Sequence, residues 1–120
     1  MKTLLIIDDD VATATALQTA LRMAGYRVVC TADGQVALSM AVAILPDLIV
    51  TDWMMPGMDG VEICSRVRAD ETLHDIPLIL MSADTPPAIG CWDEYFPKPV
   101  EVPQLLRSID ALLAAAEKLV

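Results

Sequence analysis

The sequence predicts an α/β domain in which helices cover both faces of a parallel β-sheet. Short apolar runs rich in β-branched residues alternate with helical patterns along the 120 residues. These runs are almost continuously apolar, which is typical of parallel strands buried on both faces. Because crossovers between parallel strands are right-handed, we expect a doubly wound, five-stranded sheet. We expect a single domain over residues 1–120, long enough to bury a core unaided.

Five short apolar segments are predicted as strands. They are Leu4–Ile7, Arg27–Thr31, Leu48–Val50, Pro77–Met81 and Tyr95–Phe96. The third run ends on a carboxylate, Asp52, and the fourth ends at Ser82. After Asp52 comes a turn-forming stretch that contains Pro56, Gly57 and Gly60 before a helical pattern resumes.

Four segments show helical spacing of apolar residues or helix boundary signals. The predicted helices cover Val11–Met23, the residues from the turn Ala32–Gly34 through Ala43, Gly60–Ala69, and a final segment that starts near Pro103. Gly25 ends the first helix and the Leu45–Pro46 step ends the second. In the third, Val61, Cys64 and Val67 are predicted to face the core.

Charge and hydropathy exclude two classes of partner. The net charge is −9, with 17 acidic and 8 basic residues, so direct nucleic-acid binding is not expected. Hydrophobic residues make up 55% of the chain, but no apolar run approaches the roughly 18 residues of a membrane span. Three aspartates follow the first apolar run, which is unlike a signal peptide. We therefore expect a cytoplasmic protein that binds no membrane.

The three cysteines show no metal-ligand spacing, and their odd number argues against a disulfide framework. Cys30 falls in a predicted strand and Cys64 in a predicted helix, so both are interpreted as small core or edge residues.

Polar residues stand where four of the predicted strands end. The carboxyl ends of parallel strands meet at one edge of the sheet, where α/β proteins place their chemistry. This edge would gather Asp8, Asp9, Asp52, Ser82 and Lys98.

This combination suits phosphoryl chemistry with a divalent cation. Two carboxylates about 4 Å apart repel by roughly 4 kcal/mol at an effective dielectric of 20, so a cluster needs a cation or a raised pKa. Mg²⁺ takes oxygen ligands and leaves water positions for a phosphate. Asp52 could act as a nucleophile towards phosphorus, while Lys98 and Ser82 contact the phosphoryl oxygens. No organic cofactor is expected.

These residues resemble the receiver domains of two-component response regulators, the CheY-like family. The match rests on Leu4–Asp9, on Asp47–Gly60 with its Met-Pro-Gly-Met-Asp-Gly tail, on Ser82–Ala83 and on Lys98–Pro99. The resemblance covers nearly the whole chain. It implies a flavodoxin-like sheet with strand order 2-1-3-4-5 and a cis peptide bond between Lys98 and Pro99.

The resemblance also implies roles for the residues at this edge. Asp52 would accept a phosphoryl group from a sensor histidine kinase or a histidine phosphotransfer protein. Asp8 and Asp9 would hold Mg²⁺ together with Asp52 and the backbone carbonyl of Met54. The remaining residues, Ser82 and Lys98, would contact the phosphoryl group.

Tyr95 matches the aromatic switch position of the family, three residues before Lys98. It would respond with Ser82 to phosphorylation and change a surface read by an unknown downstream protein. No output domain follows Val120, so we expect partner binding, onward phosphotransfer, or a place in a longer chain. The domain would catalyse only its own phosphorylation and dephosphorylation.

One region departs from the family. The stretch from Ser82 to Lys98 is shorter than usual by about two helical turns. Pro86, Pro87 and Gly90 disfavour a helix there, so no helix longer than about one turn is expected between Ser82 and Tyr95. The fourth helix of the family would then be shortened or absent, which puts the usual output face in doubt.

Two alternatives use other parts of the same pattern. A phosphohydrolase would use Asp8 as nucleophile and Asp10 as a second acid. The sequence motif of such enzymes has Thr or Val two residues after the second Asp, where this chain has Ala12. A flavin-binding protein would share the topology, but the aspartates at 8–10 would repel the flavin phosphate. A phosphotransfer intermediate remains an alternative within the receiver interpretation.

Overall fold

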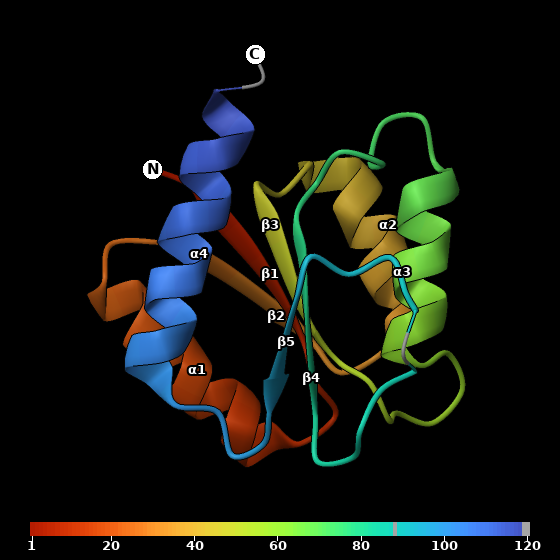
Figure 1. The fold of residues 1–120 in the computed structure, drawn as a ribbon, viewed down its shortest axis with the longest axis horizontal. Coiled ribbons are helices and arrows are strands. Elements are labelled where there is room, and N and C mark those ends of the chain that lie inside the picture. Colours follow the sequence, from red (N-terminus) through yellow and green to blue (C-terminus); the bar gives the residue numbers. More distant parts are fainter. Residues whose placement is uncertain (88, 119–120) are drawn as a thin grey trace.

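The structure is a computed structural model that describes residues 1–87 and 89–118 (Figure 1). Strands and helices alternate along most of this chain. They are β1 (Thr3–Ile7), α1 (Val11–Met23), β2 (Arg27–Thr31), α2 (Gly34–Ile44), β3 (Leu48–Asp52), α3 (Gly60–Ala69), β4 (Leu78–Ser82), β5 (Glu94–Pro97) and α4 (Val102–Glu117). The predicted elements are all present, and the bounds of α1, β2 and α3 are those expected from the sequence.

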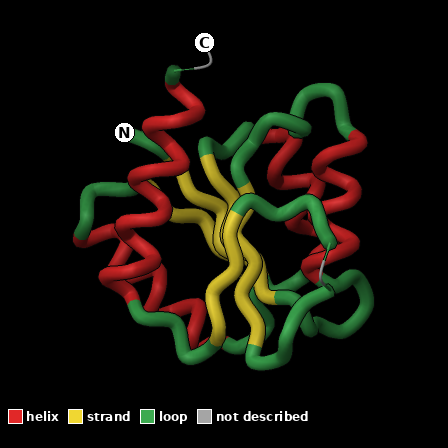
Figure 2. The backbone as a smooth tube through the Cα atoms, viewed as in Figure 1, coloured by secondary structure: helices red, strands yellow, loops and turns green. Residues whose placement is uncertain are grey.

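The five strands form one parallel sheet in the order β2-β1-β3-β4-β5, which confirms the predicted fold class. The sheet is the middle layer of three. Figure 2 shows α1 and α4 on one side of it and α2 and α3 on the other. This arrangement follows from right-handed crossovers on either side of β1. The predicted cis bond between Lys98 and Pro99 is also present.

The core has two parts, one on each face of the sheet. Side chains alternate between faces along β1: Leu4 and Ile6 pack with α1 and α4, whereas Leu5 and Ile7 pack with α2 and α3. Because β1, β3 and β4 are buried on both faces, almost every position along them is apolar. The apolar runs of the sequence thus correspond to the interior strands.

Aspartates begin three of the four described helices. Asp10, Asp33 and Asp59 each accept a backbone N–H from the first turn of α1, α2 and α3. Such caps satisfy N–H groups that have no partner within the helix. At its C-terminal end, α2 stops at Leu45, which adopts a left-handed conformation with φ of 48°. Pro46 follows and cannot continue the helix.

The connection between β4 and β5, residues 83–93, is called the β4–β5 segment below. Its described residues, 83–87 and 89–93, form no helix, as the prolines predicted. The chain does have a fourth helix, but this is α4, which follows β5. In Figure 1 the β4–β5 segment runs past α3 before it enters β5.

The structure corrects the interpretation of the cysteines. Cys64 on α3 is joined by a disulfide to Cys91 in the β4–β5 segment, 27 residues further on. Their Cα atoms are 6.1 Å apart, within the range that a disulfide spans. An odd number of cysteines leaves room for one bridge, and Cys30 is the remaining free thiol.

No helix in the described part of the chain is both long enough and apolar enough to span a membrane.

Candidate functional site

Four strands deliver the predicted site residues to one edge of the sheet. Asp8 directly follows β1, Asp52 is the last residue of β3, Ser82 is the last residue of β4, and Lys98 directly follows β5. Parallel strands end on the same side, so residues far apart in sequence become neighbours. The structure brings Asp9 to the same place, and these five residues are called the acidic edge below.

Three carboxylates and one ammonium lie close together at the acidic edge. One carboxylate oxygen from each of Asp8, Asp9 and Asp52 lies within 4.8 Å of the others. The Nζ atom of Lys98 is 2.9 Å from Asp8 Oδ2 and 3.3 Å from Asp52 Oδ2. Asp8 and Asp52 are only 2% and 7% exposed, while Asp9 is exposed to solvent. Lys98 is therefore the counter-ion of two buried carboxylates.

The pKa values of Asp52 and Lys98 are both raised at the acidic edge. Burial, followed by the negative charge of Asp8, raises the pKa of Asp52 to about 6, although Lys98 acts in the opposite direction. Burial works against the charged form of Lys98, but its contacts with Asp8 and Asp52 outweigh this and raise the Lys98 pKa. The lysine thus stays charged, while Asp52 carries a charge that the fold only partly compensates.

The backbone around Asp52 is fixed by two close contacts. Thr51 is fully buried, and its hydroxyl donates to the carbonyl of Asp52 at 2.9 Å. A Cβ atom on Gly60 would lie 2.2 Å from that same carbonyl oxygen, so the start of α3 fits against β3 only with glycine. From the sequence, Gly60 was noted only as a residue of the turn-forming motif after Asp52. The one sign of its close packing against β3 was that a glycine stands at the start of a predicted helix.

Ser82 and Tyr95 are linked through the backbone of the β4–β5 segment. The Oγ atom of Ser82 accepts the N–H of Asp84 at 2.9 Å. The hydroxyl of Tyr95 donates to the carbonyls of Ser82 and Asp84, at 3.1 and 3.0 Å. The two predicted switch residues are therefore in contact. Met54 is exposed in the loop after β3, and the role of its carbonyl stays a prediction.

Asp10 belongs to the helix α1 rather than to the acidic edge. Its carboxylate accepts the N–H of Ala12 and the N–H and hydroxyl of Thr13. These bonds to the first turn of α1 lower the pKa of Asp10, so the group is held ionised as a helix cap. An ionised cap is unsuited to donate a proton, which argues against the phosphohydrolase alternative.

The donor set of the acidic edge fits a hard divalent cation. Three carboxylates with one exposed member can supply oxygen ligands, and the exposed side leaves room for water. A cation would also relieve the repulsion that raises the pKa of Asp52. Asp8, Asp9 and Asp52 are the residues that would hold it.

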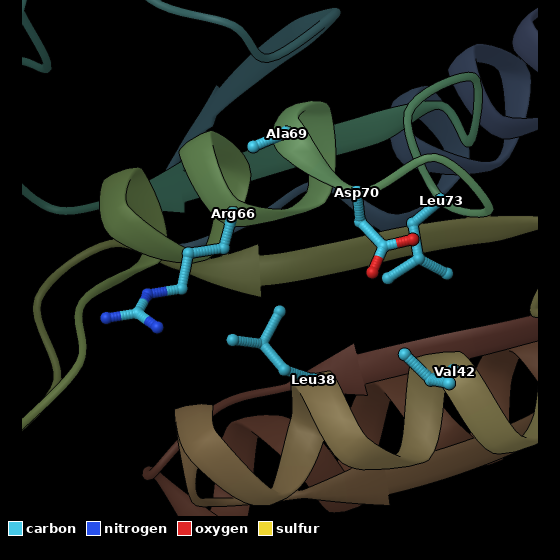
Figure 3. Close-up of a pocket in the computed structure, with 6 residues that line it drawn as sticks. All are labelled: Leu38, Val42, Arg66, Ala69, Asp70 and Leu73. Atoms are coloured by element: carbon cyan, nitrogen blue, oxygen red, sulfur yellow. The ribbon is translucent and has the colours of Figure 1, made fainter.

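Two surface pockets lie outside this cluster. One, of about 340 Å³, lies between α2 and α3 and is lined by none of the predicted site residues (Figure 3). The other, of about 450 Å³, lies between α1 and the connection from β5 to α4, and Lys98 forms part of its wall. Only the second pocket adjoins the acidic edge.

The sequence matches the response regulator receiver domain family over residues 4–110. It is 37% identical to the DNA-binding dual master transcriptional regulator RpaA of Synechocystis sp., over 99% of this chain and 52% of that protein. The chain thus spans about half the length of this curated relative.

Solved structures agree with the family match. The CheY-like receiver domain protein of Methanospirillum hungatei has a TM-score of 0.91 at 25% identity and covers 98% of both chains. The response regulator TrrA of Thermotoga maritima, solved in complex with Mg²⁺-BeF, has a TM-score of 0.85 at 27% identity, covering 93% of this chain and 99% of that one. The chain belongs to the response regulator receiver domain family.

Proposed function

We propose that this receiver accepts a phosphoryl group on Asp52 in a reaction that requires Mg²⁺. The observation that carries the proposal is the buried carboxylate of Asp52, which lies within 4.8 Å of the Asp8 and Asp9 carboxylates and 3.3 Å from the Lys98 ammonium. Asp8 and Asp9 would hold the metal with Asp52 and with the carbonyl of Met54. When bound, the metal would supply positive charge that offsets the negative charge on the oxygens of the incoming phosphoryl group.

The residues of the chain have distinct parts in the transfer. An ionised oxygen of Asp52 forms the new bond to phosphorus while the phosphorus–nitrogen bond of a phosphohistidine breaks. Lys98 already contacts Asp52, so its positive charge can stabilise the phosphoryl group during and after the transfer. Ser82 Oγ accepts from Asp84, so its own proton is free to be donated to a phosphoryl oxygen.

Phosphorylation would be read through the β4–β5 segment. If Ser82 moves towards a phosphoryl group on Asp52, the carbonyl that Tyr95 now contacts moves with it. The hydroxyl of Tyr95 also holds Asp84, so the start of the segment has to rearrange. Residues 84–87 include exposed positions next to this contact, and they would present the change to a downstream protein.

A histidine kinase or histidine phosphotransfer protein would dock at the pocket beside Lys98. The walls of this pocket include Ala16 and Leu17 of α1 and Val100 and Val102 near α4, which offer apolar contacts next to the acidic edge. A protein seated there would bring its phosphohistidine to Asp52. We expect Ala16→Glu to slow phosphotransfer from a kinase of the same source while leaving phosphorylation by acetyl phosphate unchanged. An unchanged rate with the kinase would place the docking surface elsewhere, and equal slowing with both donors would show that the substitution disturbs the acidic edge itself.

The test of the proposed function is phosphorylation by acetyl phosphate with and without Mg²⁺, followed by the mass of the intact protein. We expect a phosphoryl adduct on the wild type only when Mg²⁺ is present, and none on Asp52→Asn. Asp33→Asn is the matched control, because Asp33 is an exposed helix cap and is not one of the five residues of the acidic edge. If Asp52→Asn gains a stable phosphoryl group as fast as the control does, the assignment of Asp52 is wrong.

A further inference from the structure

The two ends of the β4–β5 segment are held in different ways. At its beginning, hydrogen bonds from Tyr95 hold the carbonyls of Ser82 and Asp84. At its end, Cys91 and Trp92 are partly buried and pack against the core cluster that includes residues of α3. Ile89, between these ends, is 91% exposed. The end next to α3 is therefore the part of the segment that is fixed to the body of the domain.

A covalent bond fixes this end in addition to packing. Cys64 is fully buried on α3, and it is bonded to Cys91, which is half-buried at the surface. The Nε of Arg68 donates to the carbonyl of Cys91 at 3.1 Å, and Nη2 reaches Asp93 at 2.8 Å. Of the two bonded residues, Cys91 is therefore the one that is partly exposed to solvent, and Cys64 is enclosed.

The bonded pair also connects the two elements that flank the acidic edge. Gly60, the first residue of α3, lies against the carbonyl of Asp52. Cys64 is one helical turn further along α3, and Cys91 belongs to the segment that begins at Ser82. A change in the bond therefore alters the restraint between α3 and the segment that we expect to respond to phosphorylation.

We propose that Cys64 and Cys91 are a reversible redox modification site, whose disulfide holds the β4–β5 segment against α3 and whose dithiol releases it. The effect on signalling rests on the function proposed above, but the redox chemistry does not. In the disulfide form the segment is restrained at both ends, so phosphorylation has less of it to order. In the dithiol form, the end near Cys91 is held in place by packing against the core and by the hydrogen bonds of Arg68.

The chemistry is thiol–disulfide exchange with a small-molecule disulfide. The Cys91 thiolate attacks one sulfur of the oxidant, which forms a mixed disulfide and releases one thiol. The Cys64 thiolate then attacks the Cys91 sulfur and releases the second thiol. In sum, the protein loses two protons and two electrons, and the oxidant is reduced to two thiols. Cys91 reacts first because Cys64 is fully buried.

Glutathione redox buffers test the proposal. The protein is equilibrated with oxidised or reduced glutathione and then unfolded in denaturant that contains a maleimide, so that every free thiol is blocked, including the buried Cys64, and the intact mass is measured. Wild type and Cys30→Ser should each lose two reactive thiols in the oxidised buffer and regain them in the reduced one. Cys64→Ser and Cys91→Ser should form no internal bond. Equal behaviour of all three thiols, or a pair that stays reduced throughout, would overturn the proposal.

Hydrogen exchange tests the consequence for the segment. The amides of residues 89–93 should exchange at least about tenfold faster in the dithiol form than in the disulfide form. Cys30→Ser should show the same difference and Cys91→Ser should show none. Equal exchange in both forms of the wild type would contradict the proposed restraint.

The Asp52→Asn variant separates this inference from the proposed function. It should form the disulfide and show the exchange difference as the wild type does, because neither needs a phosphoryl group. If wild-type Asp52 is not phosphorylated in either redox form, the proposed function fails while the redox site stands. If phosphorylation orders the segment equally in both forms, the regulatory part of this inference is wrong.

Discussion

The acidic edge and the β4–β5 segment are built in opposite ways. At the acidic edge, backbone hydrogen bonds within the sheet place the residues, and the side chains lie at strand ends. In the segment, side chains carry the structure: Arg68, Cys91 and Trp92 hold a backbone that forms neither helix nor strand over residues 83–87 and 89–93. The sheet thus determines where the residues of the acidic edge lie, whereas the path of the segment depends on individual side-chain contacts, and we expect it to be the part that responds to phosphorylation.

The largest effect should come from removing the side chain that holds the segment. The guanidinium of Arg68 donates to the carbonyls of His74, Ile76 and Cys91 and to the carboxylate of Asp93. Arg68→Ala should lower the free energy of unfolding by about 4 kcal/mol, since four hydrogen bonds from a charged group are lost.

Arg66→Ala is the matched control for Arg68→Ala. Arg66 lies on the same helix, and its ion pair is with Glu62 one turn away at the surface. It should cost only about 0.3–0.5 kcal/mol. Urea denaturation of both variants compares them, and equal costs would show that Arg68 does not hold the segment.

The second effect is an increase in stability when the charge of Asp52 at the acidic edge is removed. The folded state raises the pKa of Asp52 from 3.8 to about 6. Below the lower value Asp52 is protonated in both states; as pH rises towards 6 the unfolded state ionises first, so stability falls. Asp52→Asn should therefore stabilise the metal-free protein above pH 6 by up to about 3 kcal/mol.

The stabilisation by Asp52→Asn should disappear below pH 3.8, where the wild-type carboxyl is protonated in both states. Excess Mg²⁺ should also reduce it, because the metal binds the folded wild type more tightly than the variant. Thermal melts across this pH range measure both trends. A variant that is less stable than the metal-free wild type at neutral pH would contradict the view that the charge of Asp52 is only partly compensated.

A smaller effect is expected where α3 begins. Asp59 accepts the N–H of Glu62 at 2.9 Å and caps the helix whose first residue contacts Asp52. Asp59→Ala should cost about 1 kcal/mol of stability. Asp59→Asn, which keeps an acceptor oxygen, should cost less. If both variants lose the same stability, the effect comes from charge rather than from capping.

The smallest change is spectroscopic. Trp53 follows Asp52 directly and is half-buried, so its fluorescence should change when Mg²⁺ binds. The titration belongs in Trp92→Phe, because Trp92 lies in the β4–β5 segment, packs against the core and would add its own signal. No Mg²⁺-dependent change at concentrations that support phosphorylation would place the metal away from Asp52.

The same contrast explains what the sequence could predict. Asp52, Ser82 and Lys98 were found because apolar periodicity locates strand ends, and parallel pairing brings those ends together. The pairing of Cys64 with Cys91 could not be found that way, because it depends on a path through a segment without periodicity. Arg68 was missed for the same reason, since its partners lie 6 to 25 positions away.

Burial along α3 shows a further limit of sequence patterns. Cys64 and Val67 are buried as predicted, but Ile63 is buried and Val61 only half-buried. At the start of α3, Gly60 lies so close to the carbonyl of Asp52 that a Cβ atom there would be 2.2 Å from its oxygen, a tertiary contact that the apolar spacing does not show. Local spacing indicates that a helix has an apolar face, whereas tertiary contacts decide which residues lie at its centre.

The coupling between the acidic edge and the β4–β5 segment is central to the proposed switch. Hydrogen exchange of the wild type with and without acetyl phosphate, in the presence of Mg²⁺, measures it directly, with Asp52→Asn as the control. We expect phosphorylation to slow exchange in the segment, over residues 84–87 and 89–92, and we expect no change in the variant. Unchanged exchange in the phosphorylated wild type, together with a response in α1, would show that the signal leaves the acidic edge by another route.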